Sequence, residues 1–318
     1  MVMMNNRRAF TIVELVTVVI IIAVLLGILL PSVTAIRAKA KDVAQRAQFN
    51  AITTALEAFK QDYGDYPPSD LYGNSTQTYY CGAQKLAEAL LGWDLMGFDP
   101  NSAWRVDGYT GTGPASVLNH PLTDQSYDPS RFRGLATFDE RRKPYLDLAT
   151  ANAFRLYRDL FSNKDSSIPA TFVLCDVYRV RKWTDPNTGK LVSAGSPILY
   201  YRATTTNKTI DMAVTFANRT YNYNDNWPIT SSLKLTANGP GGLKHPFDSP
   251  SSDGTEYPVF YSDRATYDST IYGGSGIGYG IRDTKIPSVA RPYNSDSYIL
   301  ISAGPDGYYG TADDIHNY

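Results

Sequence analysis

The chain changes abruptly from polar to apolar residues near its start. From Phe10 to Leu30, 21 consecutive positions contain no Lys, Arg, Asp, His, Asn or Gln, and Leu, Ile and Val dominate. An α-helix rises about 1.5 Å per residue, so a run of this length crosses the roughly 30 Å hydrocarbon core of a bilayer. The pattern predicts a transmembrane helix over residues 10–30, in which Glu14 is the only charged residue.

A second, amphipathic pattern follows Pro31. Apolar residues recur at spacings of three and four as far as Phe59, and charged residues lie largely on other faces. This predicts that the helix continues over residues 31–62, with a bend near Pro31 and with one face packed against the rest of the chain. "YGDYPPS" then ends the helix, because Gly64 and the following pair of prolines interrupt helical hydrogen bonding.

Residues 63–318 have the composition of a globular domain rich in strands, turns and loops. The chain has 24 Tyr, 24 Gly and 19 Pro, a mixture that favours strands and turns over helix. Short apolar runs predict strands at 170–183, 191–204, 209–216, 232–237, 257–262 and 297–303, and helices at 83–91 and 150–161. The predicted fold class is therefore α+β: a long N-terminal helix packed on an antiparallel-sheet domain with long loops.

The net charge and the cysteine content exclude few classes of function. The formal net charge is −1, and Lys and Arg do not cluster beyond "RRK" at 141–143, so the sequence predicts no nucleic-acid-binding surface. Cys81 and Cys175 are the only cysteines, and an exported domain permits a disulfide between them. The sequence leaves their pairing open, because it does not give the distance between their Cα atoms.

The sequence contains no catalytic motif. His120, His245 and His316 are far apart and form no HExxH pair, and "YGGSGIGYG" at 272–280 matches neither GxGxxG nor GxSxG. We therefore expect a protein without enzymatic activity.

Glu14 is the feature that an ordinary membrane anchor does not explain. A carboxylate inside a transmembrane helix costs at least a few kcal/mol unless something pairs with it. A signal anchor and a cleaved secretory signal would both provide the apolar run, but neither needs the acid, and the run is long for a secretory signal. A cut before Phe10 would create an ammonium group at the depth of Glu14, on the same chain or on a neighbouring copy.

The residues around this point resemble the class III signal of type IV pilins and type II secretion pseudopilins. "RRA" followed by "FTIVELV" gives a short basic leader, a small residue before the cut, Phe at the first mature position and Glu at the fifth. The resemblance implies that prepilin peptidase removes residues 1–9 by cutting between Ala9 and Phe10, and that Phe10 is methylated. It also implies that Glu14 neutralises the amino terminus of an adjacent subunit during assembly. Ala9 departs from the family pattern, in which Gly is usual before the cut.

The last 22 residues, "SYILISAGPDGYYGTADDIHNY" at 297–318, contain a second candidate site. A predicted strand runs into a glycine-rich loop that carries three Asp residues. Ca²⁺ takes about six to eight oxygen ligands, commonly carboxylates mixed with backbone carbonyls. The loop is not an EF-hand, and it resembles the calcium loop of type II secretion major pseudopilins. The ligands that this implies are the side chains of Asp306, Asp313 and Asp314 and the carbonyls of Leu300 and Ser302. An exposed acidic turn without metal is the alternative.

The resemblance implies a structural subunit, nearest to the G-type major pseudopilin of type II secretion. Identical subunits would be drawn from the membrane by an inner-membrane assembly platform and its ATPase, and would form a helical filament through the helix from Phe10 to Asp62. The exported domain, residues 63–318, would lie in the periplasm or outside the cell, because the basic leader stays in the cytoplasm. Residues 70–290 exceed what usually separates the helix from the terminal strands, so they are predicted to be an enlargement or insertion.

Two alternatives from other classes remain open. A minor pilin or adhesin would use the large Tyr-rich domain to bind a surface, a sugar or another partner. A membrane-anchored enzyme with a borrowed signal is the second alternative, and no motif in the sequence supports it.

Overall fold

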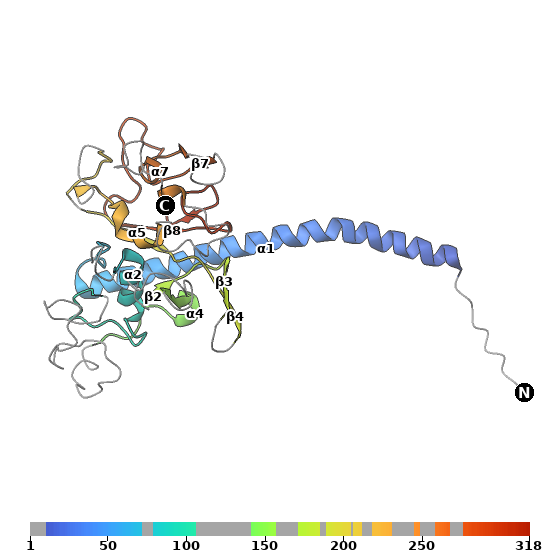
Figure 1. Cartoon of the computed structure of the whole chain (residues 1–318), viewed down its shortest axis with the longest axis horizontal. Coiled ribbons are helices and arrows are strands. Elements are labelled where there is room, and N and C mark those ends of the chain that lie inside the picture. Colours follow the sequence, from blue (N-terminus) through green and yellow to red (C-terminus); the bar gives the residue numbers. More distant parts are fainter. Residues whose placement is uncertain are drawn as a thin grey trace, which may run out of the picture. The chain divides into compact units, whose positions relative to one another are not determined.

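The computed structural model describes residues 11–71, 79–105, 141–156, 171–184, 189–204, 206–211, 218–230, 245–248, 258–267 and 276–318. These residues confirm the predicted α+β fold class, with one long helix and small antiparallel sheets (Figure 1). The chain divides into two units, Met1–Ala44 and Gln45–Tyr318.

Helix α1, Ile12–Tyr63, is 52 residues long and passes from the first unit into the second. The helix is unbroken at Pro31, although a proline removes one helical hydrogen bond. Nearby hydroxyl groups bond to helical carbonyls: Ser32 Oγ donates to Ile28 O at 3.0 Å, and Thr34 Oγ1 donates to Pro31 O at 2.8 Å. The predicted bend at Pro31 stays a prediction.

In the second unit, α1 buries one face against the domain. Its buried residues follow the spacing of three and four that the sequence predicts. They are Gln45, Gln48, Phe49, Ile52, Ala55, Leu56 and Phe59. Most of the apolar ones share a core with Leu86, Leu90 and Leu91 of helix α2, which spans Gly82–Leu91. Burial of one such Leu or Ile side chain contributes about 1.5–3 kcal/mol, so this face holds the helix on the domain.

The remaining elements are short. The central sheet has three antiparallel strands in the order β5 (Leu199–Arg202), β8 (Tyr298–Ser302) and β9 (Ile315–His316). Three further antiparallel pairs are β1 (Ala153–Arg155) with β2 (Phe172–Leu174), β3 (Arg181–Thr184) with β4 (Leu191–Ala194), and β6 (Ala265–Tyr267) with β7 (Gly276–Gly278). The short helices are α4 (Leu148–Ala151), η5 (Tyr223–Asn226), α5 (Trp227–Thr230), η8 (Pro246–Asp248) and α7 (Pro258–Tyr261).

Strand β8 lies between two apolar cores, and all five of its residues are buried. Tyr298 and Leu300 belong to the core that contains the buried face of α1. Ile299 and Ile301 belong to a second core on the opposite face, as the alternation of side chains along a strand requires. The predicted strand over 297–303 is confirmed, and its burial on both faces explains its continuous apolar sequence.

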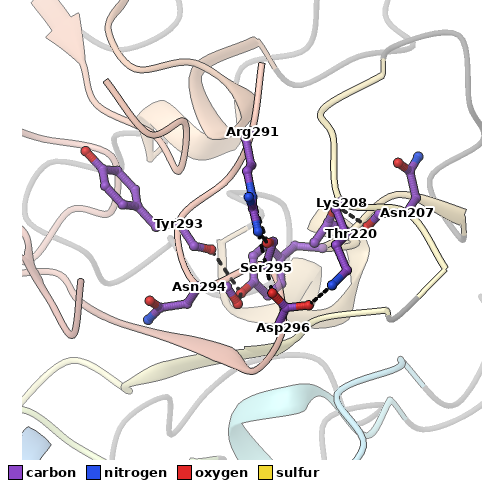
Figure 2. Close-up of polar contacts among 9 residues, drawn as sticks. Asn207, Lys208, Thr220, Arg291, Tyr293, Asn294, Ser295 and Asp296 are labelled. Atoms are coloured by element: carbon purple, nitrogen blue, oxygen red, sulfur yellow. Dashed lines mark hydrogen bonds and ion pairs between the residues drawn. The ribbon is translucent and has the colours of Figure 1, made fainter. Parts of the chain in front are cut away.

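A polar cluster holds the turn that leads into β8 (Figure 2). Arg291 donates from Nε and Nη2 to Ser295 Oγ at 3.0 and 2.8 Å, and its Nη2 lies 3.5 Å from Asp296 Oδ2. Lys208 pairs with the other oxygen of Asp296 and lowers the pKa of that carboxyl. Ser295 is buried, but the charged side chains are 39–59 % exposed, so their ion pairs contribute little to stability.

Two predicted elements are wrong. The helix predicted over 150–161 ends at Ala151, because Asn152 adopts a left-handed conformation with φ 48°. The Asn152 side chain donates to the carbonyls of Cys175 and Asp176 at 3.1 and 2.7 Å, and the chain continues as β1. The strand predicted over 257–262 is the short helix α7 instead, since a brief apolar run does not distinguish a strand from a buried helical turn.

Other predicted elements are confirmed in part or fall outside the described residues. The helix at 83–91 is α2, which ends at Gly92 with φ 87°. The strand at 170–183 is two strands, β2 and β3, and that at 191–204 is likewise two, β4 and β5. The strand at 232–237 and most of that at 209–216 lie outside the described residues, and 209–211 are not in a strand.

The two cysteines are free thiols in this structure, and both are completely buried. Burial raises the pKa of the Cys81 thiol to about 12, so it is protonated and unreactive at neutral pH. The disulfide that the sequence left open is therefore not formed.

Candidate functional site

Glu14 forms a capping box with Thr11 at the start of α1. Glu14 Oε2 accepts hydrogen bonds from Thr11 N at 2.9 Å and from Thr11 Oγ1 at 2.8 Å. In return, Glu14 N donates to Thr11 Oγ1 at 3.2 Å. A Thr followed three residues later by Glu is the sequence signature of this motif. "TIVE" at 11–14 carries that signature, which the interpretation from sequence did not include.

The capping box lowers the penalty of placing Glu14 within a membrane. A carboxylate in hydrocarbon is most costly when it has no hydrogen-bond donor. Thr11 supplies two donors from the same chain, and both bond to Oε2. A cation that approaches Glu14 would therefore meet its other oxygen, Oε1. The predicted cleavage residues, Ala9 and Phe10, lie outside the described residues.

The rest of the first unit presents an apolar surface. Every residue from Thr11 to Ser32 is exposed, and the Ile, Leu and Val side chains between Ile12 and Leu30 are 47–81 % accessible. Among the described residues, α1 is the one helix that is long and apolar enough to cross a membrane. A soluble domain rarely leaves so large an apolar surface uncovered, so we assign this segment as the membrane anchor.

Two buried amides join α1 to the domain within the second unit. Gln48 Nε2 donates to Cys175 O at 3.0 Å and to Thr150 O at 2.9 Å. Gln45 Nε2 donates to Gln48 Oε1 at 3.0 Å, and Gln45 Oε1 accepts from Val177 N at 3.0 Å. Both side chains are almost completely buried, so they fix the register of the helix against two other segments.

Two aspartates of the C-terminal loop accept hydrogen bonds from backbone N–H groups of the same loop. Asp313 Oδ2 accepts from Asp306 N at 3.0 Å, and Asp314 Oδ2 accepts from Gly310 N at 2.7 Å. Gly304 has φ 63° and approaches so closely that an added Cβ would lie 2.3 Å from Asp313 O. A glycine is thus required where the loop folds back on itself.

Two carboxyl groups of this loop, those of Asp306 and Asp314, have raised pKa values, and burial is the largest cause. Burial and the neighbouring charge of Asp313 raise the pKa of Asp306 to about 6. Burial raises the pKa of Asp314 further above its ordinary value, and the charges of Asp306 and Asp313 add to the effect. A nearby cation would favour the charged forms and reverse these shifts.

The donor set suits Ca²⁺ in chemistry, but its arrangement does not form a coordination site. Carboxylates and freed carbonyls are the ligands that Ca²⁺ prefers. Among the residues that the structure describes, no three His, Cys, Asp or Glu side chains are grouped as metal ligands. The Leu300 carbonyl accepts a hydrogen bond from Asn317 N at 3.4 Å. Calcium binding by Asp306, Asp313, Asp314, Leu300 and Ser302 therefore stays a prediction.

A buried carboxylate, Asp176, which sequence reasoning missed, lies beside this loop. Ser302 Oγ donates to Asp176 Oδ2 at 3.2 Å, and burial raises the pKa of Asp176 to about 7. Asp176 follows β2, 126 positions before Ser302 in the chain. No local pattern connects residues at that separation, so no sequence signal was available.

The N-terminal residues match one family model, described as "Prokaryotic N-terminal methylation motif", over residues 4–30. The match includes Ala9, Phe10, Glu14 and the apolar run. No curated protein and no solved structure matches the chain significantly. The chain thus carries the N-terminal signal of a type IV pilin-like precursor, and this motif implies processing by prepilin peptidase and pilus-type assembly in general.

Proposed function

We propose that this chain is a structural subunit of a pilus-like filament, nearest to the major pseudopilin of type II secretion, without enzymatic activity. One observation carries the proposal: the methylation motif continues into a helix of membrane-spanning length whose first turn holds Glu14. A simple anchor has no use for that carboxylate, whereas a subunit that recognises its neighbour's amino terminus does.

In this proposal, assembly begins with a proteolytic cut. Prepilin peptidase cleaves between Ala9 and Phe10, and Phe10 becomes methylated. The new ammonium group belongs to the residue directly before Thr11 in the sequence. The ammonium of a neighbouring subunit then binds Glu14, which sets the axial position of one helix against the next.

The exposed apolar half of α1 is the packing surface of the proposed filament. Helices in lipid gain little from the hydrophobic effect, so close packing and paired polar groups drive their association. Glu14 supplies the polar pair, and the apolar residues from Ile12 to Leu30 supply the packing. An inner-membrane platform with its ATPase extracts each subunit, while the domain after α1 lies in the periplasm or outside the cell, opposite the basic leader.

We further propose that Ca²⁺ binds the C-terminal loop. The cation would neutralise the repulsion among Asp306, Asp313 and Asp314, with the carbonyls of Leu300 and Ser302 as further ligands. The support is the set of raised pKa values in the loop together with the oxygen-rich donor set. A rigid loop would tie the C-terminal residues to β8 and β9 and would give neighbouring domains a fixed surface.

A minor pilin or adhesin is the second candidate, and the size of the second unit favours it. That unit extends from Gln45 to Tyr318, which leaves room for a binding surface in the enlarged part, residues 70–290. Filament imaging separates the two functions. A major subunit forms uniform filaments when it is expressed with the assembly system as the only pilin-like chain. A minor subunit yields no filament alone and appears at one end, or at scattered positions, of filaments built from another subunit.

A further inference from the structure

Asp225 is a buried carboxylate at the junction of three segments. It lies in η5, and its side chain faces Ser69, which is in the segment that leaves α1. Ser69 Oγ donates to Asp225 Oδ2, and Ser69 Oγ accepts a hydrogen bond from the backbone N of Arg202 in β5 at 3.0 Å. Asp225 and Ser69 are each 4 % exposed. One hydroxyl therefore connects η5, β5 and the chain after α1.

The position of Asp225 is fixed by its neighbour Asn226. Asn226 Oδ1 accepts from Ala83 N at 2.8 Å in the first turn of α2, and Asn226 Nδ2 donates to Tyr200 O at 2.7 Å. Gly82 permits this close approach, because an added Cβ there would lie 2.4 Å from Tyr200 O. Displacement of this turn from α2 and β5 would break these contacts.

The surroundings of Asp225 do not compensate a negative charge. Its Oδ1 atom makes no hydrogen bond of standard geometry, and no described Lys or Arg lies within ion-pair distance of it. Lys85 on α2 pairs with Asp70 at 3.1 Å, and Arg202 in β5 pairs with Asp65. The titratable groups on the elements packed around Asp225 are Asp70, Cys81, Lys85, Tyr201, Arg202 and Tyr261.

The protonation state follows from this environment. Burial is the largest effect and raises the pKa of Asp225 to about 7; the charge of Asp70 adds to it, while Ser69, Lys85 and the Leu71 backbone oppose it. In an opened state the carboxyl would meet water and return toward its ordinary value of 3.8. The closed state, in which Asp225 is buried, is thus favoured most below that value and becomes less favoured as pH rises toward about 7, above which its free energy changes no further.

We propose that the burial of Asp225 makes its junction with Ser69 a pH-sensitive latch. Ionised Asp225 favours an opened state in which its carboxylate meets water, so the latch holds the segment after α1 on the domain in acid and loosens it as the pH rises to neutrality. The latch acts on a single chain and does not depend on filament formation. It gives the exported domain a response to the pH of its surroundings at the point where the helix joins the domain.

Hydrogen exchange tests the latch on the full chain in detergent micelles. The reporter is the backbone amide of Arg202, after correction for the intrinsic pH dependence of exchange. In the wild type, its protection is expected to fall about tenfold per pH unit between pH 5 and pH 7 and then to level off. Asp225→Asn, which keeps the shape and removes the charge, should show the same protection throughout this range. The exposed control Asp263→Asn should retain the wild-type profile.

The proposal is overturned if the wild type shows no fall in protection, or if Asp225→Asn shows the same fall. Other buried carboxylates, such as Asp176, titrate in a similar range, so the difference between wild type and Asp225→Asn is the decisive quantity. Ser69→Ala provides a second variant if Asp225→Asn fails to fold. It removes the acceptor of the Arg202 amide and should lower protection at every pH. Because Ser69 lowers the pKa of Asp225, the fall in protection should also continue to a higher pH than in the wild type, and a profile without a fall would contradict the latch.

Discussion

Gln48 on α1 donates a hydrogen bond to the carbonyl of Cys175, 127 positions along the chain, at 3.0 Å. Gln45 donates to Gln48 and accepts from Val177 N, and together these hydrogen bonds attach the helix to the segment after β2. Gln48→Leu should lower the free energy of unfolding by about 1–3 kcal/mol, because it leaves buried polar groups without partners. Urea unfolding of the full chain in micelles measures the change. Gln61→Leu, on the exposed side of the same helix, is the matched control and should change stability by less than about 0.5 kcal/mol.

The methylation motif predicts a mature chain that begins at Phe10. Cells that contain prepilin peptidase should yield an N-terminal peptide starting at Phe10 and heavier by one methyl group. Mass spectrometry of the N-terminal peptide checks both features. Ala9→Gly should be processed at least as fast, since Gly is the residue that the family usually has before the cut. A mature protein that retains Met1, or one cut beyond Pro31, would show that the motif is not used.

Glu14 and Thr11 should have separable effects on insertion and assembly. Glu14→Ala removes a costly charge, so it should insert into the membrane at least as well as the wild type but should not enter filaments. Thr11→Val removes the hydroxyl of the capping box and keeps the carboxylate. It should insert less well, by the loss of a donor worth about 0.5–1.5 kcal/mol, while Glu14 can still bind a neighbour's ammonium. Membrane fractionation and filament yield measure the two steps, and a normal filament yield from Glu14→Ala would refute the pairing role.

Local patterns predicted the elements that bury apolar residues at a regular spacing. The helical spacing predicted α1 to within two residues of its observed ends, and the continuous apolar run predicted β8. The prediction over 150–161 failed because Asn152 is left-handed and its side chain donates to the carbonyls of Cys175 and Asp176, just after β2. The conformation of this segment therefore depends on contacts with residues far away in the chain, which the sequence does not show.

In the candidate site too, the sequence revealed residues that are close along the chain and missed contacts between distant ones. Glu14 was identifiable because a charge in an apolar run is conspicuous, and Asp306 and Asp313, which a hydrogen bond joins, are close in sequence. Thr11 could also have been found from the sequence, because "TIVE" at 11–14 carries the capping-box signature. The contacts of Ser302 with Asp176 and of Ser69 with Asp225 join residues 126 and 156 positions apart, so the sequence alone gave no access to them.

The C-terminal loop should respond to calcium. Asp306, Asp313 and Asp314 repel one another, and Ca²⁺ would remove that repulsion in the folded state only. A ligand in hundredfold excess over its Kd stabilises the fold by about 2.7 kcal/mol. The full chain in micelles should therefore melt at a higher temperature with calcium than with chelator, and magnesium should substitute poorly because it gives up its waters reluctantly. Asp306→Asn should abolish most of the difference, and Asp283→Asn should preserve it.

The pH dependence of that stabilisation is the sharper test of the calcium site. A carboxylate must lose its proton before it can bind a metal, so calcium binding competes with protons. Since the pKa of Asp306 is raised to about 6 in the folded chain, calcium affinity should fall as the pH is lowered through 6. Calorimetric titration at pH 7.5 and at pH 5 measures the affinity at each pH, and use of two buffers with different ionisation enthalpies gives the number of protons released. Identical melting curves with calcium and with chelator at pH 7.5 would show that the loop is an acidic turn without a metal.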